Sequence, residues 1–189
     1  MASVVEICNV ALIRCGAETI TSLDQDAKRA SLCKIMYEPT RDSLLRSHPW
    51  NFANRRKLLA ASDTEPAFEF DYQYPLPSDY LKMQRVYDDY GHRIESMDDG
   101  TKVLLSNETE IYIEYTAKVT DPNLMDPMFR QALSLALAVA ICPALTENAK
   151  MVEGIATQAQ EMLSAARSTD AQEGTPRDPD TDVFVVARI

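Results

Sequence analysis

Few side chains in this 189-residue sequence are of the types that do chemistry, and His48 is the first of them. It stands in the run Ser-His-Pro-Trp at the end of a predicted helix, and an imidazole titrates near neutral pH and can transfer protons. The alternative is a packed, hydrogen-bonded helix end, which we favour because proline and tryptophan follow directly. His92, the other histidine, follows Gly91 in a predicted hairpin turn, where we expect it to be solvated.

Two carboxylate pairs, Asp88-Asp89 and Asp98-Asp99, are the next candidates. Carboxylate oxygens are the ligands that hard cations prefer, so either pair is a conceivable metal site. Both pairs fall in predicted turns, however, where aspartate is common because its side chain bonds to the nearby backbone. We favour the interpretation that they are solvated turn residues.

The run Arg55-Arg56-Lys57 is the only basic cluster. Three such charges suit a phosphate or the carboxylates of a partner. Equally, they suit the exposed face of a strand whose other face holds Phe52 and Leu58 or Leu59.

Motifs of known enzymes are absent from the sequence. It has no G-x-S-x-G, H-E-x-x-H, Walker loop or dinucleotide fingerprint, and its five glycines leave little material for a loop around phosphate. The four cysteines lie on apolar helix faces without C-x-x-C spacing, and we interpret them as buried thiols: Cys8, Cys15, Cys33 and Cys142. We therefore predict no catalytic, cofactor-binding or metal-binding residue, no cofactor and no enzymatic activity.

Composition narrows the class further. Hydrophobic residues make up 46% of the chain and charged residues 25%, which is typical of a globular protein. The net charge of −10 argues against sequence-specific DNA reading, since no overall basic surface exists. The N-terminus lacks the pattern of a targeting segment, and the longest apolar run, 132–145, is too short to span a bilayer. We expect a soluble chain with no membrane partner.

Apolar residues at helical spacing predict four helices. The first begins with Ser3 and Glu6 as a capping box and stops at Gly16, and the second begins near Asp26 and contains Pro39, where we expect a kink or break. The third begins at Asp126-Pro127 and must be covered all round, because it is apolar on nearly every side. Pro143 is expected to break it, and the fourth begins at about residue 146.

Between residues 50 and 115 the apolar period changes to two. Aromatic residues alternate with polar ones over 68–74, which predicts a half-buried strand, and shorter strands are predicted at 82–87, 93–97, 102–105 and 110–115. The pattern favours an antiparallel β-meander.

The predicted fold class is therefore α+β. A helical bundle of about four helices comes from residues 1–49 and 126–167, with a β-rich insertion at 50–125. Residues 168–189 form an extended C-terminal arm, because a polar, acidic stretch there is followed by the apolar run 183–186. Such an arm either binds a partner surface or folds back on its own sheet, and composition does not choose between them.

Several segments of the sequence, in their order along the chain, resemble segments of the tail tubular protein A family of bacteriophages. Members of this family are the head-to-tail adaptors of short-tailed phages. The likeness covers residues 4–166. Its strongest pieces are Trp50-Asn51-Phe52 and the run Tyr-Pro-Leu-Pro-Ser-Asp-Tyr-Leu at 74–81.

The resemblance implies a structural virion protein, assembled in the host cytoplasm and located in the phage neck or tail. It implies a ring, with twelve copies expected, between the portal protein and a tail nozzle protein similar to tail tubular protein B. DNA would pass through the lumen without specific contacts, and no cofactor is implied.

The same resemblance implies roles for two sets of residues. Trp50 and Phe52 would anchor the junction between helices and sheet, and the C-terminal arm would dock on the portal. The docking residues would be Phe184, Val185, Val186 and Arg188, although the arm lacks the tryptophan expected of the family.

Two functions of other classes stay open. A tail-associated enzyme that degrades cell walls would need two carboxylates converging in a cleft. A DNA-packaging subunit would need a basic helix face, and the second helix offers basic residues only among acidic ones, such as Lys28, Arg29, Lys34 and Arg41.

Overall fold

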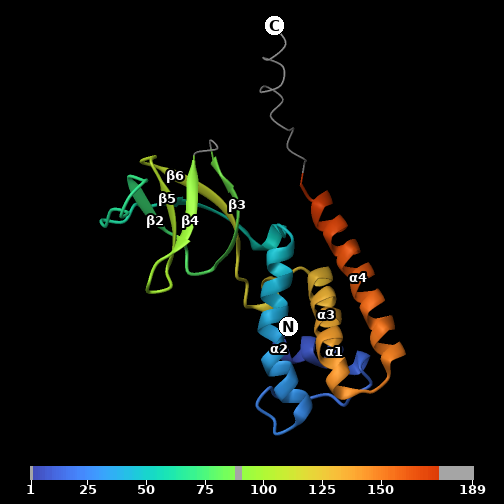
Figure 1. Cartoon of the computed structure of the whole chain (residues 1–189). Helices are drawn as coiled ribbons and strands as arrows, with labels where there is room; N and C mark the ends of the chain where they lie inside the picture. Colours follow the sequence, from blue (N-terminus) through green and yellow to red (C-terminus); the bar gives the residue numbers. More distant parts are fainter. Residues whose placement is uncertain (1, 88–90, 175–189) are drawn as a thin grey trace.

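The computed structural model describes residues 2–87 and 91–174, and this part of the chain contains four α-helices and two small antiparallel sheets of three strands each (Figure 1). The helices are α1 Val4–Arg14, α2 Lys28–Ser47, α3 Pro127–Leu145 and α4 Ala149–Gln172, with short 3-10 helices η1 Asn51–Ala53 and η3 Pro122–Leu124. The strands are β1 Asn54–Leu59, β2 Tyr72–Pro75, β3 Tyr80–Val86, β4 His92–Ser96, β5 Lys102–Ser106 and β6 Ile111–Ala117.

Local capping chemistry sets the starts of α1 and α3, as the sequence predicts. The Ser3 hydroxyl accepts a hydrogen bond from the Glu6 N–H at 3.1 Å, and Gly16 follows α1 with a φ of 69°. The Asp126 carboxylate accepts from the N–H groups of Met128 and Phe129, at 2.7 and 3.1 Å, with Pro127 as the first helical residue.

Two prolines lie inside helices without ending them there: the predicted break at Pro143 is wrong, and of the kink or break predicted at Pro39 the break does not occur. Pro39 leaves the carbonyl of Ile35 without its helical donor, but Ile35 is exposed, so water can take that place. Pro143 lies in the last turn of α3, and the helix still closes with a bond of 2.9 Å from Thr146 N–H to the Cys142 carbonyl. A proline in a last turn removes only one donor, so the break comes two residues later than predicted.

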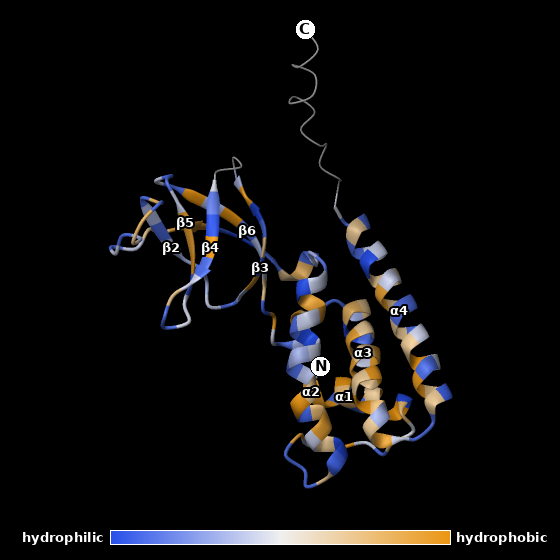
Figure 2. Cartoon of the chain, viewed as in Figure 1, coloured by the Kyte–Doolittle hydropathy of each residue, from blue (hydrophilic) through white to orange (hydrophobic). Residues whose placement is uncertain are grey.

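Helix α3 is the centre of the helical part. It contacts α1, α2 and α4, and Figure 1 shows it lying between α2 and α4. Its buried side chains include Phe129, Leu133, Leu137 and Ile141, and Figure 2 shows the helix as mostly apolar. Three neighbouring helices cover α3, but only about half of it is buried, so the predicted covering on all sides is met only in part.

The length of α3 corrects another prediction. Its 19 residues, with a mean hydropathy of 1.6, are long and apolar enough to cross a membrane, whereas the run 132–145 alone is too short. Half of this apolar stretch is buried inside the protein.

Strand β6 pairs with both β1 and β3, while β5 pairs with both β2 and β4. Within the described residues only β4 and β5 are consecutive and paired, so a single meander is the wrong topology. The predicted strand over 68–74 is also mostly wrong. Glu69 has a φ of 74°, which interrupts an extended chain, and Phe68 is 77% exposed; only Tyr72 onward forms a strand.

Buried side chains from both sheets form one core, separate from the core of the helices. Ile111, Ile113 and Tyr115 of β6 face this core together with Tyr74 of β2 and Leu104 of β5. Because side chains alternate along a strand, Tyr112 lies on the opposite, outer face of the sheet β1-β6-β3.

The start of the C-terminal arm is the last correction. Residues 168–172, predicted as part of the arm, continue α4 to Gln172, since Ala166 is buried and Asp170 has partners on the end of α2. The remaining arm from residue 175, with Phe184, Val185, Val186 and Arg188, lies outside the described residues.

Leu133→Ala tests the role of α3. Leu133 is fully buried, so truncation leaves a cavity, and we expect a loss of about 2–5 kcal/mol in the free energy of unfolding, measured by urea denaturation. Leu124→Ala is the matched control, because Leu124 is exposed and its loss should change stability by less than about 0.5 kcal/mol. Equal effects of the two variants would contradict the assignment of α3 as the core.

Candidate functional site

The end of α2 and the last turn of α4 meet at His48. Pro49 prevents α2 from continuing, and His48 turns to an extended conformation, with φ −149° and ψ 148°. Its Nε2 atom lies 3.0 Å from Oδ2 of Asp170 on α4, 122 residues away along the chain. The structure therefore places His48 in a contact between two helix ends.

Asp170 is occupied on both carboxylate oxygens. Besides the histidine at Oδ2, the Asn51 backbone N–H donates to Oδ1 at 3.0 Å, and the Asn51 side chain donates to the Asp170 carbonyl at 2.6 Å. The carboxylate is 9% exposed and the imidazole 19% exposed. Such a carboxylate fixes the last turn of α4 to the chain that follows α2, and we call His48, Asn51 and Asp170 the helix-end clamp.

An aromatic cluster lies beside the clamp and joins the same elements to α3. The Trp50 ring meets His48 edge-on at 4.7 Å between centroids, and Phe129 of α3 lies 5.0 Å from both Trp50 and Phe52. The Trp50 indole N–H donates to the Leu44 carbonyl at 3.0 Å. Trp50 and Phe52 thus lie where the helices give way to β1, the position that the resemblance implies for them.

A second polar contact, between α2 and the chain after β6, is absent from the sequence predictions. Arg41 is 2% exposed; its Nε donates to Asp42 at 2.8 Å, and Asp42 also pairs with Lys118 at 2.9 Å. The guanidinium lies over the ring of Tyr37, and burial raises the pKa of that phenol to about 12. Tyr37, Arg41 and Leu45 follow one another at intervals of four residues on the buried side of α2. This spacing could have predicted from the sequence that Arg41 is buried.

Two of the four cysteine thiols have a raised pKa, whereas the hydrogen bond with Cys8 lowers the pKa of the Cys33 thiol. All four are buried. The pKa of Cys8 is raised by its hydrogen bond with Cys33 and by burial, and burial together with Cys142 raises the pKa of Cys15 to about 12. A thiol with a raised pKa is protonated at neutral pH and reacts slowly.

Of the acidic candidates, the pair Asp98-Asp99 lies in a turn. Asp99 accepts a hydrogen bond of 2.8 Å from the Thr101 N–H between β4 and β5, and this bond lowers the pKa of its carboxyl. Asp98 is exposed in the same turn, His92 is exposed at the start of β4, and Asp88-Asp89 lies outside the described residues. Among residues 2–87 and 91–174, no three His, Cys, Asp or Glu side chains are grouped as metal ligands.

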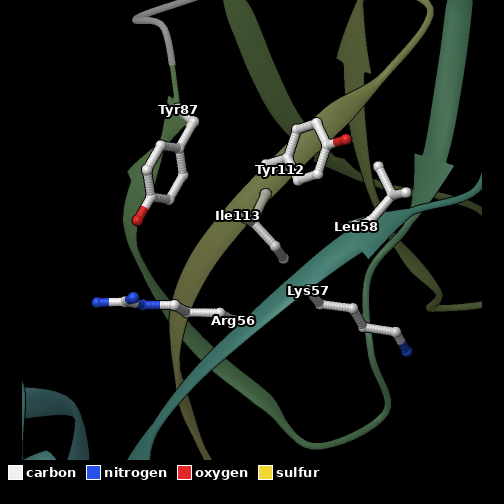
Figure 3. Close-up of a pocket in the computed structure, with 6 residues that line it drawn as sticks. All are labelled: Arg56, Lys57, Leu58, Tyr87, Tyr112 and Ile113. Atoms are coloured by element: carbon white, nitrogen blue, oxygen red, sulfur yellow. The ribbon is translucent and has the colours of Figure 1, made fainter.

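The basic run lies on β1, and part of it lines a hollow. Arg56, Lys57 and Leu58 line this hollow of about 380 Å³ with Tyr112 and Ile113 of β6 and with Tyr87, which follows β3. Figure 3 shows Tyr87, Tyr112 and Leu58 arranged across the three strands. Leu58 and Tyr112 remain 50% and 45% exposed, so the sheet β1-β6-β3 has an open apolar floor with cations beside it. We call this the basic hollow.

Comparisons with known proteins add no assignment: no protein-family model matches the chain, and no curated protein matches it. Function must therefore be argued from the helix-end clamp and the surfaces around it.

Asp170→Ala tests the helix-end clamp. The change leaves the His48 ring and the Asn51 N–H without their acceptor in a largely buried place, so we expect a loss of about 1–3 kcal/mol in the free energy of unfolding by urea denaturation. Glu173→Ala, at an exposed position just after α4, should be close to neutral. An unchanged stability of Asp170→Ala would contradict the clamp.

Proposed function

We propose that this chain is a structural phage virion protein. It is a head-to-tail adaptor that forms a ring, with twelve copies expected, between the portal and the tail nozzle, and DNA passes through the ring. On this proposal the protein is not an enzyme, and its partners are the portal, the nozzle protein and further copies of itself.

The observation that carries the proposal is the helix-end clamp. The histidine with the most promising sequence context is bound to Asp170 and packed on Trp50, and this contact holds the last turn of α4. The sequence after α4 includes the apolar run 183–186. An apolar segment that follows a fixed helix end suits docking, because the helix end holds its point of attachment to the protein.

The arrangement of the elements supports the same role. We interpret α1 to α4 as one bundle built from both ends of the chain, with the strands inserted between α2 and α3. In an adaptor, the bundle would form contacts between copies and the strands would face the nozzle. The net charge of −10 suits a lumen along which DNA slides, since an acidic wall repels phosphates instead of holding them.

Deleting residues 183–189 tests the docking role. We expect loss of binding to the cognate portal ring, measured by co-sedimentation, because the apolar contact of the arm is removed. The circular dichroism spectrum and thermal unfolding midpoint should stay unchanged, since the deleted residues lie beyond α4.

A point variant sharpens the experiment. Phe184→Ser should weaken portal binding at least about tenfold, as expected for an aromatic anchor, while Thr181→Ser in the polar stretch should bind like the unaltered chain. Full portal binding by the deletion variant would refute the docking role of the arm.

A further inference from the structure

Charge is unevenly distributed over the strands. The sheet β1-β6-β3 carries five basic side chains and one acidic one, although the chain as a whole has a net charge of −10. The basic residues are Arg55, Arg56, Lys57, Lys82 and Arg85, and the acidic one is Glu114. The basic hollow therefore lies on a positive sheet of an acidic protein.

The hollow combines this charge with uncovered apolar surface. Leu58 and Tyr112 form a pair across β1 and β6 and are both about half exposed. The guanidinium of Arg85 lies 5.3 Å from the centre of the Tyr87 ring, and Arg56 is largely exposed beside Glu114. A ligand for such a surface carries an apolar side chain surrounded by carboxylates.

The same chain carries a surface of that composition. The loop 60–71 and the turn 97–101 hold six exposed carboxylates and no lysine or arginine: Asp63, Glu65, Glu69, Asp71, Asp98 and Asp99. Phe68 of this loop is 77% exposed, and Met97 is 41% exposed in the turn. Residues 66–70 and 95–97 line one shared cavity, so loop and turn are neighbours, and we call them the acidic knob.

The acidic knob and the basic hollow are separate surfaces of one molecule. The knob lies beside the sheet β2-β5-β4, and Figure 1 shows its loop on the side of the strands farthest from the helices. Arg93, a basic residue of this sheet, is paired with Glu69 at 3.2 Å and with Glu95 at 3.1 Å. Carboxylates of the knob therefore outnumber the cations beside it.

We propose that the basic hollow of one copy receives the acidic knob of a second copy, with Phe68 packing on Leu58 and Tyr112. This inference rests on the proposed function, for which it names the contact between copies. Because the two surfaces differ, a pair of copies keeps one unused knob and one unused hollow, and repetition of the contact produces a ring when the rotation closes. The contact joins strands of neighbouring copies in addition to any contact between their helices.

Nucleic acid is the other class of ligand with charges that suit the hollow. The six carboxylates of the knob lie on the same strand-rich part of the chain, and the overall charge is negative, so phosphates approach this protein against repulsion. Glu114 also lies on this sheet among the cations. The Asn54 amide donates a hydrogen bond to its carboxylate at 2.5 Å, and the Arg56 guanidinium forms an ion pair with the carboxylate at 3.9 Å. These charges favour a protein surface, and among protein surfaces the knob of a second copy.

Charge reversal on each surface tests the contact by sedimentation velocity. One variant combines Arg56→Glu in the hollow with Arg85→Glu beside it, both on the face of Tyr112, and the other combines Glu65→Lys with Asp98→Lys in the knob. Each variant alone should weaken self-association at least about tenfold compared with the unaltered chain, because like charges then meet. Raising the salt from about 0.05 to about 0.5 M should weaken self-association of the unaltered chain, since exposed charges are screened.

Mixing supplies the decisive readout. In an equimolar mixture each variant offers the surface that the other needs, so association should return to the level of the unaltered chain. Phe68→Ser should weaken association without any change of charge. Lys150→Glu and Glu161→Lys are single charge reversals of the same two kinds at exposed positions of α4, and both variants should associate normally.

Four outcomes would overturn the inference: an unaltered chain that stays monomeric, variants that associate normally by themselves, a mixture that stays dissociated although both variants keep their circular dichroism spectra, or a hollow variant that loses affinity only for a single-stranded oligonucleotide. None of these outcomes removes binding to the portal, so failure of this contact and failure of the adaptor proposal are distinguishable.

Discussion

The exclusion of water from α3 is the constraint on which the rest of the structure depends. This helix is apolar on nearly every side, and each square ångström of apolar surface removed from water contributes roughly 25 cal/mol. Three helices cover it: α1, α2 and α4. The chain therefore leaves the helical part after α2, forms the strands and returns to the helical part at α3. Phe129 then extends this core to Trp50 and Phe52, where the strands begin.

Polar contacts hold the helices and strands together in addition to the apolar core. The helix-end clamp holds the last turn of α4 to the end of α2, while Arg41, Asp42 and Lys118 tie α2 to the end of β6. Both contacts use ionisable groups to hold elements together. The surfaces left open, the basic hollow and the acidic knob, combine exposed apolar side chains with charge of opposite sign, and this combination is typical of surfaces that bind other proteins.

Sequence reasoning succeeded where the cause was local. Ser3 and Asp126 cap helices through atoms two or three residues away, so their roles could be predicted. It failed where distant contacts decide. The partners of β6 are β1 and β3, from the start and the middle of the strand-rich segment, and α4 continues to Asp170, which contacts His48 and Asn51. The junction at Trp50 and Phe52 came from a family resemblance, whereas Asp170 carried no signal of its own.

The account's central claim is that these surfaces serve assembly and not turnover of a substrate. Electron microscopy of the purified chain mixed with its cognate portal ring tests that claim most directly. The account predicts a closed ring of copies seated on the portal, with the carboxyl ends of α4 toward it and strand-to-strand contacts between neighbours. Portal rings that remain bare at saturating concentrations of a folded chain would contradict it.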